Sequence, residues 1–148
     1  MEFLAQVDKK AVSWIFRAKD SRNYQAAKLI IARAGPLPTL VLRHYAVLGG
    51  VETSHKDTVL PITVRGDTMF DIKLEVRGAD FSVRVQDRLV DSWTDNHLPS
   101  GAIGFFSSKG ESSRIRWVRF QHQNDVLGRI CAFLSRPASA GDSKRSWE

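Results

Sequence analysis

The sequence predicts an all-β protein made of antiparallel strands, arranged as a sandwich or a barrel. Apolar and polar residues alternate in short runs such as residues 81–85, which is the period of a half-buried strand. Breaks rich in Asp, Gly, Pro and Ser separate these runs, for example at 97–101 and 107–113. A helical period begins only after Gln123. Short strands at this spacing are typical of antiparallel sandwiches and barrels.

The first half of the chain contains six segments with the character of strands. They are residues 2–7, 11–18, 23–33, 38–47, 58–64 and 68–76. In the second of them Val12, Trp14 and Phe16 share one face, which indicates a core face. Pro61 marks its segment as an edge strand or a bulge, because proline cannot donate to a sheet ladder. A polar loop is expected at 49–57.

The second half continues the series with four more strands. They are expected at 81–86, 89–93, 102–106 and 114–120. Asp87 and Arg88 fit a tight reversal between the first two. Since glycine does not follow Asp87, the sequence favours a turn other than the common Asp-Gly hairpin.

Beyond residue 122 the pattern changes from strand to helix. Asn124 or Asp125 can cap a helix, although Gly128 weakens it by about 1 kcal/mol relative to alanine. The apolar positions at helical spacing are Val126, Leu127, Ile130, Cys131 and Leu134. The predicted organisation is a sandwich at 1–122, a short amphipathic helix packed on it at 123–135, and a disordered polar tail at 136–148.

Composition is that of an ordinary globular domain. The chain has 148 residues, 43% of them hydrophobic and 26% charged, with a net charge of +6. The basic residues are scattered along strands, so we expect solvated faces and no nucleic-acid partner. The single cysteine, Cys131, excludes an intramolecular disulfide and is expected to be a buried thiol.

The sequence contains neither a signal peptide nor an apolar run of the ~20 residues that would span a bilayer. The default localisation is therefore cytoplasmic, unless a preceding segment has been lost. Localisation is otherwise unknown from this sequence.

Four segments carry a resemblance to a known family. Residues 81–90 resemble a strand, turn and return strand, residues 98–106 a "G-x-[IV]-G-[FL]" strand, residues 115–120 a closing strand, and residues 14–24 an N-terminal hairpin. Together they resemble the concanavalin A-like jelly rolls, which include laminin-G-like, glucanase-like and 3-keto-disaccharide hydrolase-type domains. The resemblance covers residues 2–121. It implies an antiparallel jelly-roll β-sandwich, to which we add the short C-terminal helix.

The chain departs from the family at its start. Such domains usually begin with one or more strands before the segment that residues 2–7 match. The resemblance therefore implies that the chain is a fragment of a longer protein. A missing strand would leave its neighbour as an open edge, so self-association through that edge is expected.

No pattern of catalytic, metal-binding or cofactor-binding residues is found. Asp71 and Glu75 lie on one predicted strand, but their separation of roughly 13 Å by strand rise is too large for a retaining glycosidase pair. The four histidines lack ligand spacing. The acidic and amide residues at 91–96 are the nearest approach to a calcium site, and turn formation explains them equally well.

A carbohydrate-binding site is the leading functional hypothesis. Sugars are held by an aromatic ring together with planar polar groups that satisfy their hydroxyls. The candidate residues are Trp14, Arg17, Asp20, Asn23, Tyr24 and Trp93. In the structural alternative Trp14 belongs to the core, Arg17 pairs with Asp20, and Asn23 serves the turn.

We therefore predict a non-catalytic carbohydrate-binding or accessory domain. One alternative, implied by the resemblance alone, is a glycoside hydrolase-like enzyme of the 3-keto-disaccharide type. The other is a structural protein-interaction module. An enzyme requires convergent carboxylates or histidines, a lectin-like module requires an exposed aromatic ring beside polar groups, and an interaction module requires an apolar patch or an open edge.

Overall fold

The computed structural model describes residues 1–33, 38–62 and 68–121, and within them the chain forms eleven strands. They are β1 (Glu2–Lys9), β2 (Ala11–Asp20), β3 (Asn23–Arg33), β4 (Thr39–Leu48), β5 (Val51–Glu52), β6 (Lys56–Val59), β7 (Met69–Arg77), β8 (Asp80–Val85), β9 (Arg88–Thr94), β10 (Ala102–Phe106) and β11 (Ser112–Arg119). The predicted helix at 123–135, the tail at 136–148 and Cys131 lie outside the described residues.

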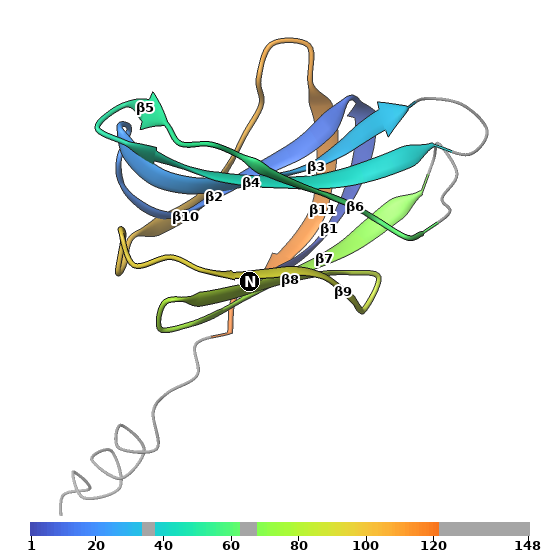
Figure 1. Cartoon of the computed structure of the whole chain (residues 1–148). Coiled ribbons are helices and arrows are strands. Elements are labelled where there is room, and N and C mark those ends of the chain that lie inside the picture. Colours follow the sequence, from blue (N-terminus) through green and yellow to red (C-terminus); the bar gives the residue numbers. More distant parts are fainter. Residues whose placement is uncertain (34–37, 63–67, 122–148) are drawn as a thin grey trace, which may run out of the picture.

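The strands form two stacked antiparallel sheets (Figure 1). Sheet A has the order β11-β1-β7-β8-β9, and sheet B has the order β10-β2-β3-β4-β5, with β6 also paired to β4. The chain passes from sheet A to sheet B between β1 and β2, so hydrogen-bonded neighbours are often distant in sequence. This arrangement confirms the predicted all-β antiparallel sandwich.

The core lies between the two sheets and is rich in aromatic rings. Phe3 of sheet A meets Trp14 of sheet B edge to face, with ring centroids 5.3 Å apart, and Phe16 meets Phe81 at 5.4 Å. Both contacts join strands of different sheets. Each large apolar side chain buried in this way stabilises the fold by about 1.5–3 kcal/mol, so these contacts hold the layers together.

Most predicted strands are present within two residues of their expected bounds. Residues 23–33 and 102–106 match β3 and β10. The prediction was wrong at 49–57, where the chain forms β5 and the start of β6 instead of a continuous loop. Both strands pair with β4 along the edge that β3 does not occupy. Their side chains are mostly exposed and show no apolar alternation, so the sequence carries no periodic signal for them.

The β8–β9 turn also differs from the prediction. The loop consists of Gln86 and Asp87, with Val85 opposite Arg88. Both loop residues have positive φ angles, 52° and 61°. This is the backbone geometry of the primed hairpin turns, which match the twist of the flanking strands. The tight reversal was predicted at Asp87 and Arg88 and lies one residue earlier, so Asp87 takes the second loop position, where aspartate tolerates the left-handed region.

The first strand lies inside a sheet and not at an edge. β1 pairs with β11 on one side and with β7 on the other. Among the described strands, β11 and β9 are the edges of sheet A, while β10 and the β5/β6 pair are the edges of sheet B. Self-association through an open edge would therefore involve one of these strands.

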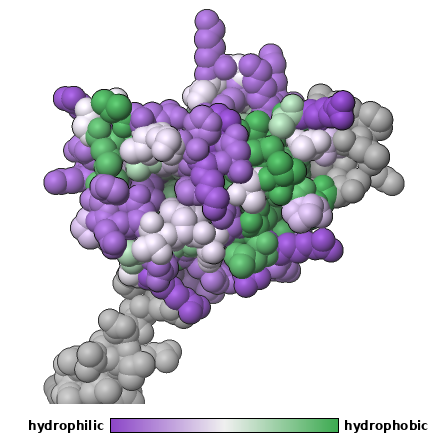
Figure 2. All heavy atoms as spheres, in the orientation of Figure 1, coloured by the Kyte–Doolittle hydropathy of each residue, from purple (hydrophilic) through white to green (hydrophobic). Residues whose placement is uncertain are grey.

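The surface in view in Figure 2 is mainly hydrophilic, with hydrophobic residues in separate groups. The described part of the chain contains no helix with the length and hydrophobicity needed to cross a bilayer.

Among the glycines that the structure describes, Gly101 should be the least tolerant of a side chain. Its φ is +156°, and a Cβ built there would lie 2.4 Å from the Arg17 carbonyl carbon and 2.6 Å from the Ala18 nitrogen. We expect Gly101→Ala to lower the free energy of unfolding by about 2–3 kcal/mol, measured by urea denaturation.

Gly49→Ala is the matched control, because Gly49 also has a positive φ of +63° but a Cβ would meet nothing within 4 Å. Backbone strain alone should cost this variant about 1 kcal/mol. Equal losses in the two variants would contradict the close approach at Gly101.

Candidate functional site

The six predicted site residues do not form one site, and Trp14 lies in the core. Its exposed fraction is 0%, which confirms the alternative that Trp14 shares a core face with Val12 and Phe16. The indole Nε1 has no hydrogen-bond partner among the described residues. Because the ring has no exposed surface, it cannot stack on a ligand that approaches from solvent.

Arg17 holds the loops at one end of the sandwich. Its φ of 51° is left-handed, at an irregularity in the pairing of β2 with both neighbours. The guanidinium donates to the carbonyl oxygen of Leu98 at 2.9 Å, and also to the carbonyls of Pro99 and Gly78. It lies 5.2 Å from the Phe81 ring centroid, a cation–π distance. Both terminal nitrogens of Arg17 thus donate to the protein itself.

Asp20 and Asn23 serve the β2–β3 turn. The Asn23 amide donates to both Asp20 carboxylate oxygens at 2.9 and 3.0 Å, and the Arg22 backbone N–H donates to one of them. These hydrogen bonds, that from Asn23 first, lower the pKa of the exposed Asp20 carboxyl. Asn23 accepts from the Gly49 N–H at 2.9 Å, which ties this turn to the β4–β5 turn. The role of Asn23 agrees with the structural alternative, whereas Arg17 contacts backbone carbonyls and not Asp20.

Trp93 is half-buried between the sheets at the side bounded by β6 and β9. Its ring stacks on His44 with centroids 3.9 Å apart and on Phe81 at 5.4 Å. Phe81 is also the ring beneath Arg17. Trp93 and Arg17 therefore both contact the Phe81 ring.

Asp91 of β9 closes the same side with polar contacts. It accepts from Lys56 at 2.9 Å and from Thr58 at 3.0 Å, both on β6, and His44 Nε2 lies 3.4 Å away without hydrogen-bond alignment. Burial alone would raise the pKa of Asp91, but the hydrogen bonds from Lys56 and Thr58 bring it below its usual value. Burial lowers the pKa of His44 despite the nearby carboxylate. These residues form a latch between the edges of the two sheets.

Tyr24 is the predicted residue that faces outward on sheet B. Gln25 and Ala27 face the core, so the alternation of β3 turns Tyr24 and Ala26 outward. On β4, Tyr45 lies opposite Ala26 and so faces the same way. The two tyrosines are diagonal neighbours, a spacing of about 7–8 Å that aromatic side chains can bridge. Both are half-buried.

Charged residues lie on the rows of the sheet beside the tyrosine pair. Arg43 and Asp57 form a two-pronged ion pair, with both bonds 2.7 Å long, on the next row of the sheet. Glu52 of β5 lies opposite Val47 of β4. Burial, and then the negative charge of Glu52, raise the pKa of Tyr45 to about 12. The Tyr45 hydroxyl therefore stays neutral and can both donate and accept hydrogen bonds. We call Tyr24, Tyr45, Arg43, Asp57 and Glu52 the tyrosine face.

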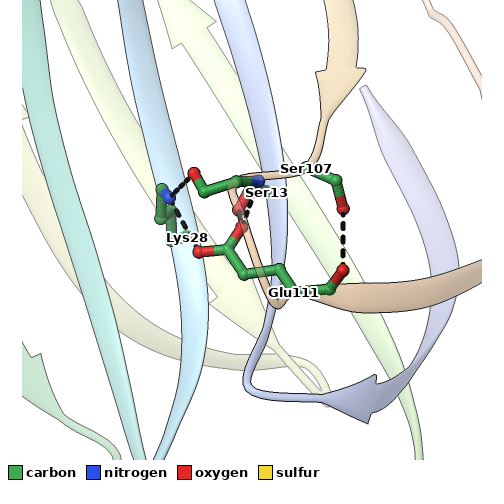
Figure 3. A network of polar contacts seen from close by, with 5 residues as sticks. Ser13, Lys28, Ser107 and Glu111 are labelled. Carbon is green, nitrogen blue, oxygen red and sulfur yellow. Dashed lines mark hydrogen bonds and ion pairs between the residues drawn. The ribbon is translucent and has the colours of Figure 1, made fainter.

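The β10–β11 loop forms one border of this surface. Figure 1 shows the loop, in orange, rising beyond sheet B, and Figure 3 shows how Glu111 fixes it there. Glu111 accepts from Ser13 at 3.0 Å and from Lys28 at 2.9 Å, while Lys28 also donates to Ser108 at 2.7 Å. Burial would raise the pKa of Glu111, but the hydrogen bonds, led by that from Lys28, lower it. The network is a staple that joins the loop to β2 and β3. We assign it a structural role because its donors and acceptors are already paired with one another.

Sequence reasoning found Tyr24 but missed Tyr45, Arg43 and Asp57. In the sequence Tyr45 extends the apolar run of Leu40 and Leu42, yet its side chain faces the other side of the sheet. Only the spacing of three positions from Leu42 to Tyr45, an odd number, could have signalled that the two side chains face opposite sides of the sheet. The pairing of Arg43 with Asp57 depends on the β4–β6 register, which the sequence does not show.

Among the described residues no group of three or more His, Cys, Asp or Glu side chains could hold a metal ion.

Comparison with solved structures identifies the fold class. A carbohydrate-binding module, CBM66 from Bacillus subtilis, matches 78% of this chain and 69% of its own length, with a TM-score of 0.57 and 19% identity. A tetrameric galectin from the ball sponge Cinachyrella sp. matches 78% of this chain and 86% of its own length, with a TM-score of 0.56 and 16% identity. No family model matches the sequence, and comparison with curated proteins found no match.

The chain therefore has the jelly-roll β-sandwich fold of these two proteins. At such low identity the similarity shows the fold and not the activity, because this fold hosts many functions.

Arg17→Lys should weaken the fold. Lysine lacks the planar fork that serves three carbonyl groups at once. We expect a loss of about 1–3 kcal/mol in the free energy of unfolding, measured by thermal and urea denaturation. Arg77→Lys, an exposed arginine at the end of β7, is the control. A stability unchanged by Arg17→Lys would show that these contacts contribute nothing.

Acid should lower the free energy of unfolding in two steps, first through His44 and then through Asp91. The pKa of His44 is lower in the folded protein than in the unfolded chain, so the unfolded chain binds the extra proton as pH falls below about 6.5. The pKa of Asp91 is also lowered, so its contribution is present above about pH 4 and is lost as pH falls through the folded-state value.

We expect His44→Gln to reduce the first decline in stability and Asp91→Asn to reduce the second, to which Glu111 also contributes, measured by urea denaturation between pH 7 and pH 3. His55→Gln, at an exposed position before β6, is the control. A wild-type curve that is flat across this range would contradict the assignment.

Proposed function

We propose that this protein is a non-catalytic carbohydrate-binding domain and that the tyrosine face is its binding site. The observation that carries the proposal is the pair of half-buried tyrosines facing outward on sheet B, with charged groups on the rows beside them. The carbohydrate-binding module and the galectin of similar fold support it as examples of sugar binding on such a sandwich.

The chemistry of the face suits a sugar. Aromatic rings present flat apolar surfaces for the C–H side of a pyranose ring, while sugar hydroxyls both donate and accept hydrogen bonds. Arg43 and Asp57 bond to each other, but their side chains are 33% and 39% exposed, so the remaining guanidinium N–H groups and carboxylate lone pairs can reach a ligand. Tyr24 and Tyr45 add hydroxyl groups.

The originally predicted residues take different parts in this proposal. Tyr24 contacts the sugar, and Asp20 and Asn23 shape the turn directly before it. Arg17 and Trp93 support the sandwich behind the site, and Trp14 belongs to its core. Membership of the concanavalin A-like group, including its laminin-G-like branch, is part of the same proposal.

Self-association through an open sheet edge is a separate proposal. Among the described strands β9 and β11 each pair on one side. Size-exclusion chromatography with light scattering tests it, and a monomer at high concentration would count against it.

The tyrosine face can be tested on a glycan array, followed by calorimetric titration of the best ligand. We expect Tyr24→Ala and Tyr45→Ala each to weaken binding at least tenfold, or about 1.4 kcal/mol, in protein that retains its circular dichroism spectrum. Tyr45→Phe, which keeps the ring, should lose less.

Trp117→Ala is the matched control. Trp117 is an exposed aromatic residue opposite Leu4, on the outward side of sheet A. This variant should bind like the wild type. Absence of binding to any glycan, or binding unchanged by both tyrosine variants, would remove the proposal.

A further inference from the structure

Four apolar side chains remain exposed on the inner faces of β10 and β11. Ile103 and Phe105 come from β10, and Val118 and Phe120 from β11 and the residue after it. Their exposed fractions are 43%, 37%, 37% and 61%. We call these four residues the apolar stripe.

The register places the four residues side by side. Phe105 lies opposite Trp14, and Val118 lies opposite Phe3. Because the Phe3 ring contacts both Trp14 and Phe105, at 5.3 and 5.0 Å, Phe105 and Val118 flank the same point of the core. Ile103 and Phe120 are the next inward positions, and the antiparallel pairing carries both toward the same end of the sandwich.

The two sides of the sandwich are therefore closed differently. At the β6/β9 side, Asp91 joins the sheets through Lys56 and Thr58. At the β10/β11 side, the apolar stripe borders the core without a comparable cover among the described residues. An exposed group of large apolar side chains on a small domain marks a binding surface.

The sequence that follows β11 can supply the missing cover. The chain leaves β11 at Arg119, directly before Phe120, and so begins its next segment at the stripe. Residues 126–134 carry apolar side chains at helical spacing, and such a helix would be roughly 14 Å long. The stripe spans roughly 7 Å along each strand. A tether of a few residues raises the effective concentration of this segment to the millimolar range, which favours it over a separate molecule.

We propose that residues 126–134 of this same chain form a helix that packs its apolar face on the stripe of Ile103, Phe105, Val118 and Phe120. The side chains that make the contact are Val126, Leu127, Ile130, Cys131 and Leu134. This segment covers the core at the β10/β11 side, whereas the Asp91 latch joins the two sheets at the β6/β9 side. The inference is independent of carbohydrate binding.

Cysteine cross-linking in the full-length chain tests the contact, because Cys131 is the only native cysteine. Val118→Cys and Trp117→Cys place a second thiol on neighbouring residues of β11 that are each 37% exposed but face opposite sides of the sheet. Under mild oxidation Val118→Cys should form the intramolecular disulfide with Cys131 at least tenfold faster than Trp117→Cys. Ile103→Cys, on the other strand, should behave like Val118→Cys.

Equal rates for the two β11 variants would overturn the proposal. Disulfides formed only between molecules would also overturn it and would assign the stripe to a second copy of the chain.

Thiol labelling of Cys131 gives a second measurement that leaves the sandwich unaltered. In the wild type Cys131 should react at least tenfold more slowly than a free thiol, and Leu127→Asp should abolish this protection. Ser135→Asp, just beyond the apolar positions, should leave it unchanged. Wild-type Cys131 that reacts like a free thiol would contradict the proposal.

Discussion

The contact between Phe3 and Trp14 is the interaction on which the rest of this structure depends. Phe3 lies on β1, which is paired on both sides within sheet A, and Trp14 lies on β2, which occupies the same kind of position in sheet B. The two strands follow one another in the chain but belong to different layers. The contact between their rings therefore fixes how the two sheets stack. Because side chains alternate along a strand, the residues that a strand turns toward the core also determine which residues face outward.

The sandwich is closed by different chemistry at its different boundaries. Arg17 gathers backbone carbonyls at one end, Asp91 joins the sheet edges at one side, and Glu111 staples the β10–β11 loop to sheet B. Each uses a charged group that forms several hydrogen bonds within the protein. Burying such a charged group carries a desolvation penalty, which its well-placed partners offset. These groups therefore specify how the parts are arranged more than they add net stability.

The same reasoning separates binding groups from structural ones. A side chain can serve a ligand only if it is accessible and if its polar atoms can exchange partners. Trp14 fails the first condition and Arg17 fails the second. Tyr24 and Tyr45 are half-buried, and burial and Glu52 raise the pKa of Tyr45, which extends the pH range in which its hydroxyl is neutral. This contrast is the reason for placing the proposed sugar site on the outward face of sheet B.

The sequence by itself determined the fold class, the approximate bounds of most strands and the core role of the face shared by Val12, Trp14 and Phe16. These depend on local alternation, which requires one apolar face for each strand. Only the tertiary structure decided that β5 exists, that Tyr45 joins Tyr24 and that Arg43 pairs with Asp57. Those features depend on the register between strands, which is set by packing across the whole sandwich and leaves no periodic signal along the chain.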